Sequence, residues 1–206
     1  MGEPQLRLMV RPEEFFREKV SEAITNQKVD IGDELEFYVV NLLCEFIAPG
    51  RLETLSGELN ALETPLALML KEAIEAPPTM RLRIFKYLGD TSLYVAGFFQ
   101  DYFNRKAFDV GYYISLGRTA YNNVSSIMRD QHGDEQFTGM YNGLAQKFRD
   151  LVEVLAEVSE TPAGQNRPVD ILAVYDRWTR SHSERLRRIL NNAGIIPLPI
   201  STREKQ

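Results

Sequence analysis

The stretch from Met80 to Met128 constrains the fold more than any other part of the chain, because it combines a helical period with a high content of tyrosine and phenylalanine. Apolar side chains recur every three or four residues along its first half, and a second line of apolar residues runs beside the first. The two lines are Met80, Ile84, Leu88, Val95, Phe98 and Tyr102, and Phe85, Leu88, Ala96, Phe99 and Phe103. A helix that is apolar on more than one face belongs in a protein interior.

A short polar segment, 104–106, separates this helix from a second one whose apolar positions run from Val110 to Met128. Helices joined by so short a connection usually pack antiparallel. We therefore predict a central antiparallel helical hairpin with Phe98, Phe99 and Tyr113 in its dry centre. Gly89 and Asp90 could end one helix and cap another, but we expect a single helix to continue through them.

The rest of the chain is also helical in pattern, so the predicted class is all-α, with about seven helices in one domain over residues 1–206. The expected elements are helices beginning at Pro12 and near Leu35, a weak one over 51–62, one from Pro65 to the prolines at 77–78, the central pair, and long single helices over 137–158 and 171–190. Residues 1–11 are expected to form a loose lead-in and residues 195–206 an extended tail.

Net charge, cysteine content and the distribution of apolar residues argue against several classes of function. A net charge of -5 argues against nucleic-acid binding, which needs clustered positive charge. The single cysteine, Cys44, cannot form an internal disulfide and fits a reducing compartment, and its apolar neighbours predict a buried thiol. No window approaches the ~18 apolar residues of a membrane span, and the first residues lack a secretory pattern. We therefore expect a cytoplasmic protein that does not bind a membrane.

No recognisable reaction motif is present. A carboxylate-bridged di-iron site would need a glutamate three residues before each histidine, but Arg129 and Thr179 precede His132 and His182 at that spacing. Nucleophile elbows, phosphate loops and zinc-type spacings are also missing from the sequence. We therefore predict no metal, no cofactor and no catalytic residue.

The polar residues of the central hairpin are the candidate ligand site. If the turn lies near residues 105–106, antiparallel pairing places Gly97 beside Gly117, which allows either close backbone approach or space for a ligand. The polar side chains that could converge there are Asp90, Tyr94, Asp101, Arg118 and Asn122. In the alternative interpretation they are structural: caps, ion pairs and core tyrosines.

Two features near the C-terminus are candidates for partner contacts. The proline-rich tail is strongly apolar at Ile195, Ile196, Leu198 and Ile200, so it lies either on the core of this protein or in a groove of a partner. The arginines of the last helix, at 177, 180, 185, 187 and 188, are expected to form a solvated face, the alternative being a phosphate or nucleic-acid patch.

Three functions are consistent with these patterns. The first is an interaction or regulatory protein, self-associating or binding a protein partner through exposed helix faces. The second is a helical bundle that binds a small molecule in the aromatic hairpin. The third is an enzyme of unfamiliar type that uses Asp90 and Asp101 as acid and base.

Overall fold

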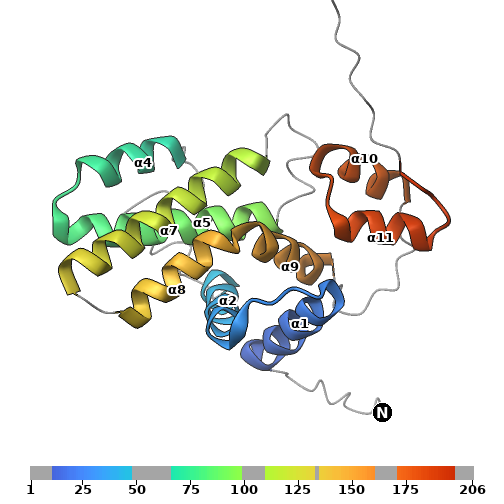
Figure 1. Cartoon of the computed structure of the whole chain (residues 1–206), viewed down its shortest axis with the longest axis horizontal. Helices are drawn as coiled ribbons and strands as arrows, with labels where there is room; N and C mark the ends of the chain where they lie inside the picture. The colour runs from blue at the N-terminus through green and yellow to red at the C-terminus, as the bar shows by residue number, and fades with distance from the viewer. Residues whose placement is uncertain (1–10, 48–65, 99–109, 133–134, 161–170, 198–206) are drawn as a thin grey trace, which may run out of the picture.

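The computed structural model describes residues 11–47, 66–98, 110–132, 135–160 and 171–197, and these ranges contain nine α-helices and no strand (Figure 1). The helices are α1 (Pro12–Gln27), α2 (Gly32–Ile47), α4 (Leu66–Glu75), α5 (Pro78–Phe98), α7 (Val110–His132), α8 (Glu135–Gln146), α9 (Phe148–Glu160), α10 (Ile171–Ser181) and α11 (Glu184–Asn192). The predicted all-α class is confirmed. Among these helices, none has the length and apolar character that a membrane span requires. The weak helix predicted over 51–62 lies outside the described residues.

Local sequence signals set several helix ends as predicted. Pro12 occupies the first turn of α1, with Glu13 and Glu14 beside it, where the missing N–H of proline costs nothing and negative charge is favourable. Pro78 likewise begins α5 after the break at Pro77. Gly194, with a φ of +80°, follows α11 and allows the N–H of Ile195 to reach the carbonyl of Leu190.

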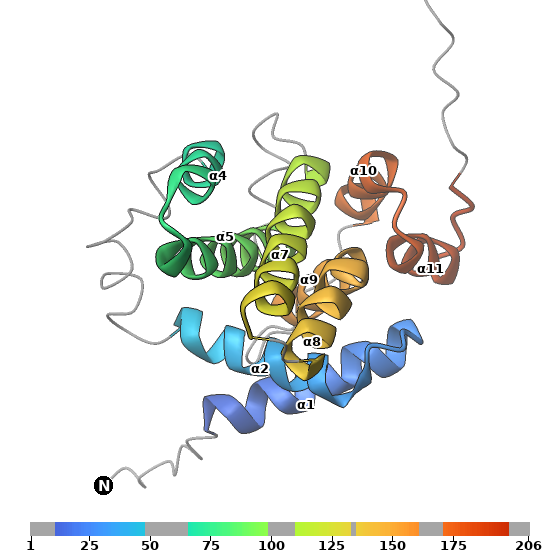
Figure 2. The same cartoon turned by 60° about the vertical axis from the view of Figure 1, so that its left-hand side comes forward.

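The central helix pair is confirmed. Helix α5 runs unbroken through Gly89 and Asp90 and packs against α7, and α4 covers α5 on its outer side (Figures 1 and 2). The most buried part of this helix pair, however, is not the part around Phe98 and Tyr113, as was predicted. Phe98 and Tyr113 are only half-buried, whereas Leu93 and Tyr121 are fully buried. Phe99 and the predicted turn at 104–106 lie outside the described residues.

The long helix predicted over 137–158 is two helices, so that prediction was wrong. The chain bends at Lys147. Helix α8, before the bend, packs on α7, and helix α9, after it, packs on α5 and α1. A continuous apolar stripe did not reveal this bend, because each half of the stripe is buried against a different neighbour. The bend also carries Phe148 into the core, where it is fully buried.

The helix predicted over 171–190 is also two helices, α10 and α11, which pack against each other. His182 adopts a left-handed backbone with a φ of 52°, and the extended Ser183 then caps α11 by accepting the N–H of Leu186 at 3.4 Å. We call α10 and α11 together the C-terminal hairpin. Its apolar cluster, Val174, Trp178, Leu186 and Leu190, is separate from the main core formed by α1–α9.

Candidate functional site

Asp90 lies at the centre of the first group of polar residues. It projects from α5 into the core, where only 6% of it is exposed. Its Oδ1 accepts hydrogen bonds from the hydroxyls of Tyr38 on α2 at 2.6 Å and Tyr121 on α7 at 2.8 Å. Its Oδ2 accepts one from Nζ of Lys86, one turn earlier on α5, at 2.5 Å. We call Asp90, Tyr38, Tyr121 and Lys86 the Asp90 cluster.

The electrostatics of the Asp90 cluster favour this hydrogen-bonding pattern. Burial is the main reason that the pKa of Tyr121 is raised well above its usual value, and the charge of Asp90 adds to the effect. Burial alone would lower the pKa of Lys86, but the charge and hydrogen bond of Asp90 outweigh it and raise that pKa. Both groups therefore remain donors to the carboxylate at neutral pH.

Three of the other residues predicted for a ligand site lie in the described part of the chain, and none of them is a member of the Asp90 cluster. Tyr94 is half-buried and stacks between Phe46, at 4.3 Å between ring centroids, and Phe98, at 5.2 Å. Arg118 and Asn122 are exposed on α7, one turn apart. Asp101 lies outside the described residues. Within the described part of the chain, the structure thus separates Asp90 from the polar residues with which it was expected to converge.

The sequence analysis did not identify the three partners of Asp90, for a different reason in each case. Lys86 stands four residues before Asp90, a spacing that signals a helical ion pair. Tyr121 is one residue from the predicted neighbour Asn122, so a small error in helix register chose the outward side chain. Tyr38 belongs to α2, and no local pattern indicated that α2 would cross the hairpin at this point.

The glycines of the hairpin do not face each other, which corrects the predicted pairing of Gly97 with Gly117. A Cβ placed on Gly97 would lie 2.4 Å from Cβ of Leu155, and one on Gly117 would lie 2.1 Å from Cζ of Phe148. Both glycines therefore admit side chains from α9. The space that they leave is filled by the protein itself and is not open to a ligand.

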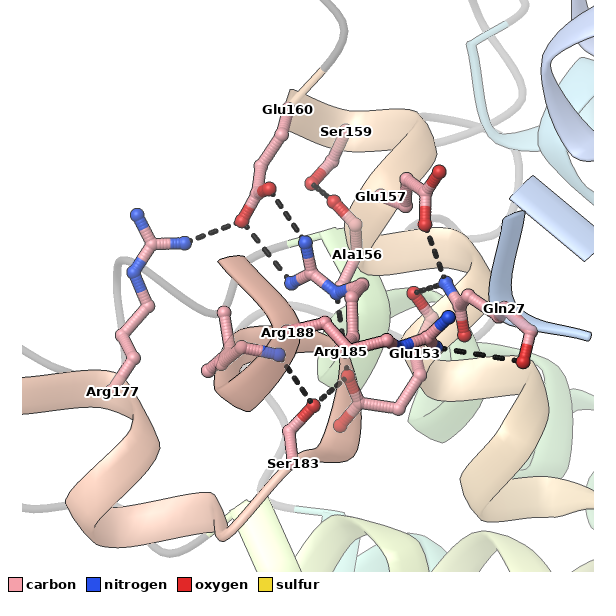
Figure 3. Close-up of polar contacts among 11 residues, drawn as sticks. Gln27, Glu153, Ala156, Glu157, Ser159, Glu160, Arg177, Ser183, Arg185 and Arg188 are labelled. Carbon is pink, nitrogen blue, oxygen red and sulfur yellow. Dashed lines mark hydrogen bonds and ion pairs between the residues drawn. The ribbon is translucent and has the colours of Figure 1, made fainter. Parts of the chain in front are cut away.

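A second group of polar residues joins the C-terminal hairpin to the main body (Figure 3). Helix α9 carries Glu153, Glu157 and Glu160 at spacings of four and three residues, which places them along one side of the helix. The C-terminal hairpin and the end of α1 supply their partners. We call this group the polar junction; its members are Asn26, Gln27, Glu153, Glu157, Glu160, Arg177, Ser183, Arg185 and Arg188.

Arg185 is the most buried charge of the polar junction, with 6% exposed. Its Nη1 and Nη2 contact the two carboxylate oxygens of Glu160 at 2.7 and 3.2 Å, and its Nε lies 3.5 Å from Glu153. Burial alone would lower the pKa of Arg185, but the hydrogen bonds and charge of Glu160 outweigh it and raise that pKa. Arg177 of α10 also donates to Glu160, at 2.5 Å, and Ser183 donates to Glu153 at 2.7 Å.

The third side of the polar junction is the C-terminal turn of α1. Glu157 accepts hydrogen bonds from the side-chain amides of Asn26 and Gln27, both at 2.8 Å. Arg188 of α11 donates to the backbone carbonyls of the same two residues, at 2.7 and 3.5 Å. A cation at this position satisfies carbonyls that a helix end leaves without an intrahelical partner, and it opposes the negative end of the helix dipole.

A polar cleft of about 440 Å³ opens between α1, α9 and α11 at the polar junction. Its lining residues are Asn26, Gln27, Glu157, Glu160, Arg185, Arg188, Ile189 and Asn192. The lining contains both charges and several amides, so it can donate and accept hydrogen bonds. Among the described residues, no group of three histidine, cysteine or acidic side chains could hold a metal ion.

The C-terminal arginines and the tail are only partly as predicted. Arg185 is buried and Arg177 is half-buried, and both bind α9, so the expected solvated face was wrong for these two. Arg187 and Arg188 are exposed as expected; Arg187 pairs with Glu184 of its own helix at 2.6 Å, and Arg188 donates to the end of α1. In the tail, Ile195 packs on the cluster of the C-terminal hairpin, while Ile196 is 81% exposed. Leu198 and Ile200 lie outside the described residues.

Comparisons with known proteins give no match: no family model, no curated protein and no solved structure resembles this chain significantly. The arrangement of the Asp90 cluster and the polar junction is therefore the evidence from which a function can be argued.

Proposed function

We propose that this chain is a cytoplasmic interaction or regulatory protein in which the C-terminal hairpin is a reversibly docked element. One observation carries the proposal: the hairpin and the main body have separate apolar clusters, and the described contacts that join them in the polar junction are hydrogen bonds and ion pairs. Interfaces of this polar kind within a chain resemble those of transient complexes, for which relative motion is the expected behaviour.

The energetics of Arg185 support reversible docking. Arg185 is buried, and removing a guanidinium from water costs free energy that a partner offsets only when the geometry is good. Glu160 keeps 35% of its side chain exposed, so solvent weakens the attraction between the two charges. The fork between Arg185 and Glu160 meets that condition, so the docked state is specific. Its net stability is nevertheless small compared with that of an apolar interface, because the gain and the cost nearly cancel.

Energy transfer within the chain tests the proposal, since Trp178 is the only tryptophan and lies in the C-terminal hairpin. An acceptor dye is placed on the exposed position of α1 by Ser21→Cys in a Cys44→Ser background. We expect efficient transfer from Trp178 in the parent and a marked loss of transfer in Arg185→Glu, which places a carboxylate against Glu160. Far-UV circular dichroism should remain the same, because both apolar clusters persist.

The matched control is Arg187→Glu, which makes the same change of charge on the same helix. Arg187 is exposed and pairs with Glu184 of its own helix, so transfer should stay at the parent value. If Arg185→Glu transfers as efficiently as Arg187→Glu, the hairpin is not held by the charges of the polar junction and the proposal is wrong.

Localisation and self-association remain predictions. The single cysteine supports a reducing compartment. Ile196 at the end of the C-terminal hairpin and Leu172 on α10 are each more than 80% exposed, which supports an apolar contact with another chain. Light scattering coupled to size exclusion tests self-association, and a mass of 23.6 kDa at all concentrations would rule it out.

Binding of a small molecule is the second candidate function. The polar cleft is a better location for the ligand than the aromatic hairpin, whose space is filled by side chains of the protein. The cleft is lined by two arginines, two glutamates and three amide side chains, which suits a small zwitterion such as a free amino acid. Titration with arginine and with glutamine, followed by the NMR signals of the side-chain amides of Asn26, Gln27 and Asn192, tests it. Unchanged signals at millimolar ligand would reject this candidate.

An enzymatic role for Asp90 has less support. A general base needs a lone pair directed at its substrate. Both carboxylate oxygens of Asp90 already accept hydrogen bonds from Tyr38, Tyr121 and Lys86.

A further inference from the structure

The segment that contains α1 and α2 is the acidic part of the chain. Between Arg11 and Ile47 the sequence has nine acidic and four basic residues, an excess of five negative charges. The whole chain has 29 acidic and 24 basic residues, so the remaining part has 20 of each, and the segment 11–47, which contains the first two helices, accounts for the net charge of -5. Helix α2 itself has four acidic residues and no basic one.

An exposed phenylalanine lies within this acidic segment. Glu34, Phe37, Asn41 and Glu45 follow one another at spacings of three, four and four residues, so they form one line along the helix, and all four are exposed. Phe37 is 59% exposed. We call these four residues the α2 stripe.

The orientation of α2 about its axis keeps Phe37 on the surface of the protein. The opposite side of the helix, with Leu35, Val39, Leu42, Leu43 and Phe46, is buried in the main core. Turning Phe37 inward would expose these five residues, so the aromatic ring has no alternative site within the described protein. Because Phe37 is held in water in this way, covering it with a partner is favourable for the free energy of binding.

We propose that the α2 stripe binds a basic amphipathic segment of another protein. The two carboxylates at its ends, on Glu34 and Glu45, are eleven residues apart, which corresponds to roughly 16 Å along the helix axis at ~1.5 Å per residue. A partner helix with lysine or arginine at that separation and an aliphatic residue between them fits both the charges and the ring. Its cations pair with the carboxylates or lie over the face of Phe37.

The chemistry of the α2 stripe discriminates among partners. Nucleic acids and acidic lipid surfaces are repelled by the negative charge, whereas an uncharged apolar segment gains no attraction from it. Glu45 also acts on Lys86, whose pKa it helps to raise, so Glu34 and Phe37 are the better positions for substitution. This proposal does not depend on how the C-terminal hairpin is docked.

Fluorescence anisotropy on the full chain tests the proposal. The probe is a fluorescein-labelled helical peptide of 18 residues with lysines on one side and leucines on the other, and its counterpart has glutamate in place of each lysine. We expect saturable binding of the lysine peptide in 50 mM NaCl, a loss of affinity of about tenfold or more in 500 mM NaCl because salt screens exposed charges, and no binding of the counterpart.

Substitutions locate the binding to the α2 stripe. Phe37→Ala and Glu34→Lys should each weaken binding about two- to fivefold, which is the scale of one cation–π contact or exposed ion pair. Both positions are exposed, so the fold should be unaffected, which circular dichroism checks. The matched controls are Phe137→Ala on α8 and Glu72→Lys on α4, which are also exposed and should bind as the parent does. Absence of saturable binding, or equal binding by Phe37→Ala and Phe137→Ala, would overturn the proposal.

Discussion

Replacing Asp90 by alanine tests whether the Asp90 cluster is a structural element of the core. The substitution removes the acceptor of three hydrogen bonds and leaves two phenol hydroxyls and one ammonium group without it. If the cluster holds α2, α5 and α7 together, this single change must lower the free energy of unfolding by several kcal/mol.

The magnitude follows from the environment of each donor. The hydroxyl of Tyr121 is in a fully buried side chain, so losing its acceptor costs about 1–3 kcal/mol. Tyr38 is half-buried and contributes about 1–2 kcal/mol by the same reasoning. Lys86 has 39% of its side chain exposed and can return to water, so its pair with Asp90 contributes at most about 1 kcal/mol. We expect a total loss of about 2–6 kcal/mol for Asp90→Ala.

Urea denaturation measures this loss. With a slope of about 2 kcal/mol per molar urea for a domain of this size, the midpoint should fall by about 1–3 M without a change of slope. Asp90→Asn retains an oxygen that can accept from both tyrosines and should lose only about 1–2 kcal/mol. Asp130→Ala, at an exposed position of α7, is the control and should leave the midpoint unchanged. A loss below about 1 kcal/mol for Asp90→Ala would refute a structural role.

Three further predictions concern other parts of the protein. Gly117→Ala should destabilise it by about 1–3 kcal/mol, because the new methyl group would overlap Phe148, whereas Gly139→Ala, in open space on α8, should stabilise it by up to about 1 kcal/mol; urea midpoints compare the two. Above pH 10 the free energy of unfolding should fall, because the raised pKa of Tyr121 keeps its hydroxyl neutral in the folded protein while it ionises in the unfolded chain. In Tyr121→Phe the free energy of unfolding should fall less steeply, by up to about 1.4 kcal/mol per pH unit, and an unchanged slope would contradict this. His182→Gly should stabilise the C-terminal hairpin by about 1 kcal/mol, seen as slower amide exchange in α10 and α11, because glycine adopts a left-handed backbone without strain.

The sequence sufficed for the class of fold and for most helix ends, because those depend on local features. Pro12 and Pro78 begin helices, Gly194 follows the last one, and the apolar period identifies the buried faces. It did not suffice for the two helices that proved to be pairs. The break at His182 puts a non-glycine residue in a left-handed conformation, and the bend at Lys147 depends on which neighbour each half meets, so neither has a strong local signal.

The candidate site was predictable only in part, for a related reason. Asp90 was identified because antiparallel pairing of the central helices places it among the polar residues of the hairpin. Its actual partners depend on the crossing of α2 and on a register difference of one residue between Tyr121 and Asn122. The polar junction was not predicted as a site. Arg185 and Glu160 are 25 residues apart in sequence, and their pairing exists only because the chain reverses direction at His182.

The separation of the two apolar clusters also bears on how the protein melts. A single melting temperature describes a chain whose parts lose their structure together, and that requires apolar contact across the whole molecule. Here the smaller cluster around Trp178 is joined to the larger one through charged groups. Heating should therefore release it first, so that a calorimetric scan shows two heat absorption peaks, the first of which moves with ionic strength.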